Sequence, residues 1–136
     1  MDYGKLAETA QALVVKGKGI LAADESSGTI KKRFDSIGTA STEENRRDYR
    51  NMLFTAEGAG QYISGVILFD ETIRQKDADG TALVKKLQDA GIIPGIKVDA
   101  GAKPLAGHPG EKVTEGLDGL SARCAEYVQL GARFAK

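Results

Sequence analysis

The stretch IIPGIKVD, residues 92–99, decides the fold of this chain. It is short, rich in β-branched residues and flanked by glycine, a pattern that predicts a buried strand. The two-residue period of a strand places Lys97 and Asp99 on one face, and Ile96 and Val98 on the other. Burying a charged pair is costly unless the pair is satisfied or faces a wet cavity. The segment therefore predicts a strand whose charged end borders a site.

Residues 19–24, 62–70 and 131–136 predict three further strands, because each is a short apolar run next to glycine. Helical spacing of apolar residues predicts helices before the first strand and between the strands. These helices are expected around residues 6–14, 30–37, 43–56, 83–90 and 117–128. The region that contains Pro104 and residues 107–110 is expected to be a long loop. Alternation of strands and helices favours a parallel α/β fold.

Two α/β architectures fit this order. A doubly wound, flavodoxin-like sheet suits a chain of 136 residues, whereas a TIM barrel needs about 250, so these residues would be roughly its first half. Asp24, Lys97 and Lys136 lie at the ends of expected strands. A sheet covered by helices on both faces would leave such charges poorly hydrated, but the strand ends of a barrel open at one mouth, where the active sites of that fold lie. The charged ends therefore favour the barrel.

The composition excludes several classes of protein. Lysine and arginine together number 19, as do aspartate and glutamate, so the net charge is +0 and no overall field attracts nucleic acid or an anionic membrane. The single cysteine, Cys124, excludes a scaffold of intrachain disulfides. The chain has no signal-peptide core and no run of roughly 18 apolar residues, so we expect a cytoplasmic protein. His108 has no second histidine or cysteine at ligand spacing, so we expect no metal site.

The segment after the first expected strand is a candidate anion site. Residues 26–29 offer hydroxyl groups and a glycine at an expected helix start, and Lys31, Lys32 and Arg33 follow. Free backbone N–H groups at a helix N-terminus and nearby cations bind phosphate. The glycine spacings of the Walker and dinucleotide-binding loops are absent. A solvated basic helix face explains the same residues.

Each charged candidate also has a purely structural explanation. Asp24 can cap the helix that follows it, and Lys97 can extend to solvent beside an acid. Arg46 can pair with the glutamates of its own helix. Lys136, as a terminal lysine, can simply be solvated. Taken singly, these residues leave both explanations open.

Read together, seven blocks of sequence carry a family resemblance. They are GILAADES at 19–26, SIGT at 36–39, TEENRR at 42–47, ILFDET at 67–72, GIKVD at 95–99, GLDGL at 116–120 and FAK at 134–136. In identity and order they closely resemble the N-terminal portion of class I (Schiff-base) fructose-bisphosphate aldolase. The resemblance implies a TIM (β/α)8 barrel. Residues 1–136 would be the N-terminal part of that single domain, supplying strands 1–3 and the start of strand 4.

The resemblance also implies an activity. Complete members are carbon–carbon lyases of glycolysis and gluconeogenesis that reversibly cleave fructose 1,6-bisphosphate to glyceraldehyde 3-phosphate and dihydroxyacetone phosphate, without a cofactor and often as homotetramers. Asp24, Lys97 and Lys136 match catalytic positions of the family. Positions that contact substrate or its phosphate correspond to Glu25, Ser26, Thr29, Lys32, Arg33 and Arg46.

The sequence departs from the family pattern at three points. Thr29 stands where the family commonly has serine, which keeps the hydroxyl group, and Ala100 stands where a lysine is frequent. The family's Schiff-base lysine and acid–base glutamate lie on later strands, beyond Lys136. We therefore expect these residues to be inactive alone and to need the remaining barrel strands in cis or in trans. A small, non-catalytic α/β phosphate-binding module is the alternative.

Overall fold

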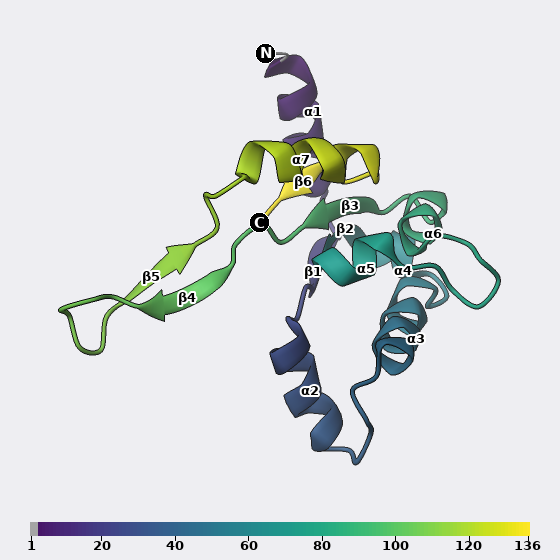
Figure 1. Ribbon diagram of the computed structural model, residues 1–136. Helices are drawn as coiled ribbons and strands as arrows, with labels where there is room; N and C mark the ends of the chain where they lie inside the picture. The colour runs from purple at the N-terminus through teal and green to yellow at the C-terminus, as the bar shows by residue number, and fades with distance from the viewer. Residues whose placement is uncertain (1–2) are drawn as a thin grey trace.

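The computed structural model describes residues 3–136, which contain a four-stranded parallel sheet in the order β1-β2-β3-β6 (Figure 1). The strands are β1 (Gly19–Ala23), β2 (Ile63–Leu68), β3 (Ile93–Ile96) and β6 (Phe134–Ala135). All four strands expected from the sequence are present, and each is shorter than expected. The hydrogen bonding of β3 continues past its end, because Lys97 N donates to Leu68 O at 2.9 Å.

Helices connect these strands in the way that a parallel sheet requires. The helices are α1 (Tyr3–Leu13), α2 (Ser27–Asp35), α3 (Glu43–Phe54), α4 (Ala59–Tyr62), α5 (Asp70–Arg74), α6 (Leu83–Asp89) and α7 (Leu120–Gln129). Thr42 caps α3, accepting a hydrogen bond from Asn45 N at 3.1 Å. The short helices α4 and α5 were not expected. Of the described helices, none is long and apolar enough to cross a membrane.

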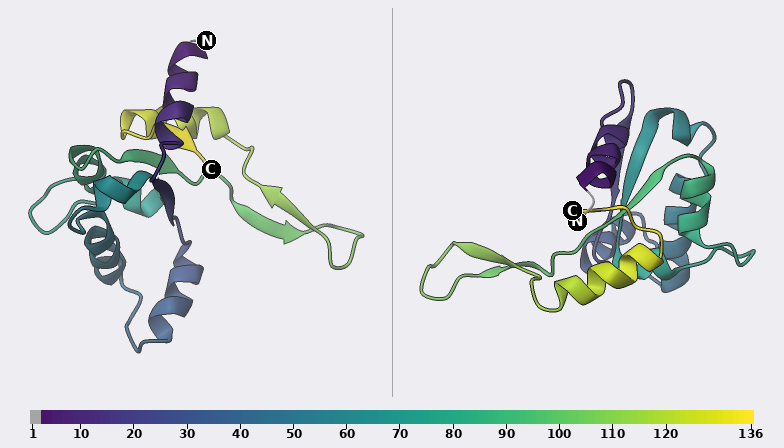
Figure 2. Two further views of the ribbon diagram at one scale, coloured as in Figure 1. Left: turned by 180° about the vertical axis from the view of Figure 1, so that it is seen from behind. Right: turned by 90° about the horizontal axis from the view of Figure 1, so that it is seen from above.

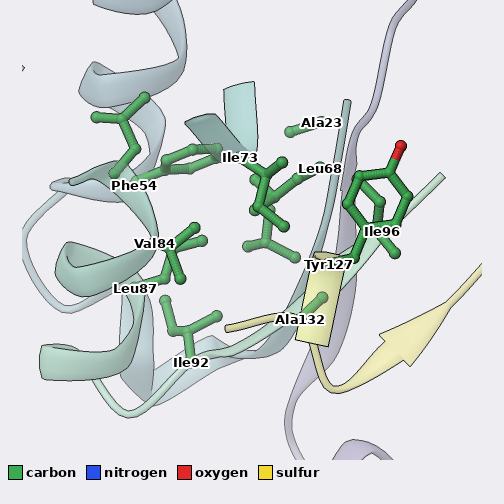
Figure 3. Close-up of a cluster of buried hydrophobic side chains, with 12 residues drawn as sticks. Ala23, Phe54, Leu68, Ile73, Val84, Leu87, Ile92, Ile96, Tyr127 and Ala132 are labelled. Atoms are coloured by element: carbon green, nitrogen blue, oxygen red, sulfur yellow. The ribbon is translucent and has the colours of Figure 1, made fainter. Parts of the chain in front are cut away.

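The strand order distinguishes the two architectures. A doubly wound sheet reverses its strand order and carries helices on both faces. In the described residues the strands of this sheet instead pair in the order in which they occur along the chain, and the main apolar core lies on one face of the sheet. Helices α3, α5, α6 and α7 contribute to that core, and Figure 3 shows their side chains meeting those of the strands. This arrangement is that of part of a TIM barrel, as the charged strand ends indicated.

The core is formed by side chains that alternate along the strands. Val66 and Leu68 point into it from β2, and Ile96 points into it from β3. Leu83 and Leu87 of α6 are fully buried against them. Burying one such side chain contributes about 1.5–3 kcal/mol, so this face supplies the main stabilisation of the fold.

On the opposite face of the sheet, glycines let an aromatic ring lie close to the backbone of the strands. A Cβ at Gly95 would lie 2.3 Å from Cζ of Phe134, and one at Gly65 would lie 3.1 Å from Cε1 of the same ring. The Phe134 ring therefore rests directly on the backbone of β2 and β3. Ile20 on the same face of β1 remains 47% exposed.

The region expected to be a long loop is instead a β-hairpin. Its strands, β4 (Gly101–Pro104) and β5 (Lys112–Glu115), pair antiparallel and extend away from the sheet, as both views in Figure 2 show. The loop prediction was wrong because the strands are polar and exposed, so they lack the apolar pattern used to find strands. Arg123 of α7 fastens the base of the hairpin, donating to Val98 O at 3.0 Å and to Gly116 O at 2.5 Å.

Candidate functional site

The strand register brings the charged candidates to one edge of the sheet. Ala23 pairs with Leu68, Leu68 with Ile96, and Ile96 with Ala135, which forms one row across all four strands. The residues that immediately follow this row on β1, β3 and β6 are Asp24, Lys97 and Lys136. Since the carboxyl ends of parallel strands meet at one edge, the three side chains come from three strands to one place.

Asp24 and Lys136 form an ion pair across the sheet. Lys136 Nζ lies 2.7 Å from Oδ2 of Asp24. The Asp24 side chain is 10% exposed and that of Lys136 is 51% exposed, so the acid is held at the sheet and the amine reaches into the open. The hydrogen bond that Lys136 donates to Asp24 raises the pKa of Lys136 above its usual value. The carboxylate contacts this amine, whereas the helix-capping explanation required it to contact backbone N–H groups.

Lys97 and Asp99 form the second pair, as the two-residue period predicts. Lys97 Nζ donates to Oδ2 of Asp99 at 2.5 Å and to the Asp99 carbonyl oxygen at 2.8 Å. Gly101 N also donates to Asp99 Oδ2. The hydrogen bond from Lys97 lowers the pKa of Asp99. The ammonium group of Lys97 is thus fixed at the end of β3, with its side chain 16% exposed.

The turn from β1 into α2 lies beside these pairs. Ser26 is the N-cap of α2, and its hydroxyl oxygen lies 3.1 Å from that of Thr29 without capping a backbone N–H group. Arg33, one turn further along α2, forms an ion pair with Glu25. Glu25 is almost fully buried. This end of α2 therefore presents hydroxyl groups, unused backbone donors and a guanidinium group.

A pocket of 260 Å³ joins the strand ends to the start of α2. Its lining consists of Ala22, Asp24, Glu25, Ser26, Thr29, Arg33, Lys97 and Lys136. Two acids, two amines, two hydroxyl groups and a guanidinium group therefore line one open pocket. Such an arrangement suits a polar, anionic small molecule.

Two candidates from the sequence lie outside this pocket. Lys32 is exposed on α2. Arg46 binds Glu71 through two hydrogen bonds, of 2.8 and 2.5 Å, and donates to Ser41 O at 2.6 Å. Its partner is therefore a residue of α5 and not the glutamates of its own helix. Substrate contact by Lys32 and Arg46 stays a prediction.

Sequence reasoning missed a buried charged group behind the site. Arg50 of α3 is fully buried and lies between the carboxylates of Glu25 and Glu71. Burial lowers the pKa of Arg50, and the hydrogen bonds from Arg46 lower the pKa of Glu71. The sequence contains one indication of this group: Glu71 directly follows the expected strand at residues 62–70, which ends on the acid Asp70. Nothing in the spacing of Arg50 distinguishes it from the exposed arginines beside it.

Residues 3–136 contain no group of three or more histidine, cysteine, aspartate and glutamate side chains arranged to hold a metal ion. The charged groups that line the pocket are Asp24, Glu25, Arg33, Lys97 and Lys136. The two amines lie on the sheet side of the pocket, and the guanidinium group of Arg33 lies on the α2 side.

Comparison with known proteins gives a consistent result. The family model for fructose-bisphosphate aldolase class-I matches residues 5–136. A protein of Xanthomonas campestris named "Probable fructose-bisphosphate aldolase class 1" is 65% identical over all 136 residues, and fructose-bisphosphate aldolase 1 of Toxoplasma gondii is 60% identical over 132 residues, 97% of the chain. The chain spans 41% and 36% of their lengths.

A solved structure gives the same match in three dimensions. It is the fructose-bisphosphate aldolase of Plasmodium falciparum in complex with TRAP and a small-molecule inhibitor, and it is 56% identical with a TM-score of 0.95. The match covers 97% of this chain and 38% of that one. The sequence blocks, the barrel-type sheet and both comparisons agree, and the chain belongs to the class I fructose-bisphosphate aldolase family.

Proposed function

We propose that these residues supply substrate-binding and proton-transfer groups of an aldolase that cleaves fructose 1,6-bisphosphate to glyceraldehyde 3-phosphate and dihydroxyacetone phosphate. The observation that carries this proposal is the convergence of Asp24, Lys97 and Lys136 on one pocket that adjoins the start of α2. Family membership supports the reaction, and the pocket has the charges that a sugar bisphosphate requires.

In a Schiff-base aldolase, a lysine amine attacks the ketose carbonyl and the resulting iminium accepts the electrons of the broken carbon–carbon bond. The attacking amine must be neutral. A neighbouring cation lowers the pKa of a lysine, and Lys136 would act on the attacking lysine in this way. Asp24, held 2.7 Å from Lys136, would stabilise the iminium by its charge. The attacking lysine itself is implied by the family to lie outside these residues.

The start of α2 would bind one phosphate of the substrate. Ser26 and Thr29 offer hydroxyl groups there, and the first backbone N–H groups of a helix attract anions. Arg33 would add a charge-assisted contact. Lys97, held by Asp99, would contact the sugar from the sheet side of the pocket.

By themselves, residues 1–136 would be inactive. Within the described residues, β1 and β6 each pair on one side only, and such edges require a partner strand. The remaining strands of the barrel would supply both the partners and the Schiff-base lysine, in cis or in trans.

We also propose a cytoplasmic location, which the 56% identity to the cytoplasmic isozyme of spinach supports. We propose a homotetramer as well, and sedimentation of an active protein would test it.

A hybrid protein tests the function. In it, residues 1–136 replace the matched 136 residues of the Xanthomonas campestris relative, and cleavage of fructose 1,6-bisphosphate is compared with that of the unmodified relative. We expect the hybrid to cleave the substrate, and Asp24→Asn to reduce kcat by roughly 100-fold or more, as loss of a transition-state charge contact does. Asp35→Asn is the matched control, because Asp35 is exposed and pairs only with Lys31.

Two results would overturn this function. One is a folded hybrid that does not cleave the substrate, and the other is an equal effect of Asp24→Asn and Asp35→Asn. If residues 1–136 bound inorganic phosphate as a folded monomer while the hybrid stayed inactive, the non-catalytic phosphate-binding module would be the better description.

A further inference from the structure

We propose that Arg50 is a positioning residue, which acts on the reaction by holding the turn that carries Asp24, Glu25 and Ser26. The inference rests on the proposed function. Arg50 lies on α3 next to the Glu25 carboxylate, and its side chain has no exposed surface. Arg50 is absent from the pocket lining, so its effect would pass through the backbone.

Stability does not explain this arginine. Its two ion pairs are long, at 3.8 Å to Glu25 and 3.7 Å to Glu71. Its Nε and Nη1 atoms make no hydrogen bond to any of residues 3–136. Removing a guanidinium group from water is costly, and buried pairs replaced by apolar residues of similar size are frequently no less stable. A buried cation with such loose pairing calls for another role.

The short contact of Arg50 indicates that role. Its Nη2 atom donates to the carbonyl oxygen of Glu25 at 2.6 Å, which is a charge-assisted hydrogen bond. Glu25 directly follows Asp24 and precedes the N-cap of α2. The guanidinium group also lies over the ring of Phe69, the residue that follows β2. Arg50 therefore binds the chain where two strands end.

The side chains of this turn are paired with Lys136, Arg33 and Thr29, whereas its backbone carbonyl at Glu25 is bonded by Arg50. Figure 1 shows α2 extending from the end of β1 away from the sheet. Only Ile30 and Phe34 of α2 are buried. Without Arg50, the peptide after Glu25 could rotate, and Asp24 would shift relative to Lys97 and Lys136. Misplacement by about 1 Å reduces catalysis by as much as roughly 100-fold.

The test uses the hybrid and the variant Arg50→Met, which keeps the length of the side chain and removes its donors. We expect kcat to fall about 10- to 100-fold with a much smaller change in KM. Phe54→Leu is the control for stability, because Phe54 is buried on the same helix and belongs to the core away from Glu25. Both variants are measured at a temperature where circular dichroism shows them folded, and Phe54→Leu should keep its kcat.

A double-mutant cycle identifies the route of the effect. If Arg50 acts through Asp24, Arg50→Met should change kcat by less than about 2-fold when Asp24→Asn is already present. The proposal would be overturned if the effects of Arg50→Met and Asp24→Asn on kcat multiply, or if folded Arg50→Met keeps its kcat. Either result would leave the proposed function intact. A folded hybrid without activity would overturn both. Should Arg50→Met not fold, Arg50→Lys is judged by the same criteria, since lysine keeps the charge but lacks the forked donors of the guanidinium group.

Discussion

Substitution of Gly116 by alanine should disturb the site from the base of the hairpin. Gly116 has φ of 134°, a conformation that side chains other than glycine rarely adopt. A Cβ there would lie 2.9 Å from Cα of Asp99 and 3.0 Å from the carbonyl oxygen of Val98. These are backbone atoms, so the segment that holds Lys97 and Asp99 would have to move as a unit.

The cost has two parts. Backbone strain of this kind costs about 1–3 kcal/mol, and overpacking against atoms that cannot rotate away costs about 1–3 kcal/mol more. We expect Gly116→Ala to reduce the free energy of unfolding of the hybrid by about 2–6 kcal/mol. Gly107→Ala in the same hairpin is the matched control. Gly107 has φ of 75° and no atom within 4 Å of its Cβ position, so only a strain of about 1–2 kcal/mol applies.

Urea denaturation of both variants measures the difference, read from the midpoints at a common slope. Gly116→Ala should be less stable than Gly107→Ala by at least about 1 kcal/mol. The variant should also lower kcat/KM, because the backbone of Val98 and Asp99 that would move directly follows Lys97. Equal destabilisation by the two variants would refute the reasoning, because it would mean that the contact with Val98 and Asp99 adds nothing to the strain.

Three further predictions follow from the contacts. Arg46 binds Glu71 and lowers its pKa, so the contribution of Glu71 to stability is present above pH about 4.3 and is lost as pH falls through the folded-state pKa. Glu71→Gln should therefore lower the free energy of unfolding by about 1–2 kcal/mol at pH 7. The urea midpoint of this variant should also depend less on pH in the acid range. Asp24→Asn should lower the pKa of Lys136, measured by NMR titration of its side chain, whereas an unchanged pKa would count against the ion pair. Leu87→Ala should lower the free energy of unfolding by about 2–5 kcal/mol in calorimetry, and a loss below 1 kcal/mol would contradict its place in the core.

Much of the fold could be predicted from local patterns. Strands were found where apolar residues run next to glycine, as at residues 63–68, and helices where apolar residues recur at helical spacing, as at residues 83–89. The hairpin was missed because its strands are exposed and polar, and the five-residue helix α5 is too short to show a period. The helical spacing around residues 117–128 did not show which side chains are buried, since Tyr127 is buried but Val128 is 67% exposed.

The site was predictable where chemistry coincides with strand ends. Asp24, Lys97 and Lys136 follow the same row of the sheet, and each stands out as a charge after an apolar run. Arg50 was not predictable, because its burial depends on three elements meeting behind the pocket. Spacing along one helix carries no information about such a meeting. The partner of Arg46 on α5 was missed for the same reason.

A crystal structure of the hybrid with a non-cleavable sugar bisphosphate tests the central claim most directly. The account predicts that the ligand lies within about 3 Å of the side-chain polar atoms of Asp24, Lys97 and Lys136, with one phosphate at the start of α2. A ligand bound elsewhere, with these three side chains in contact with protein atoms alone, would contradict it.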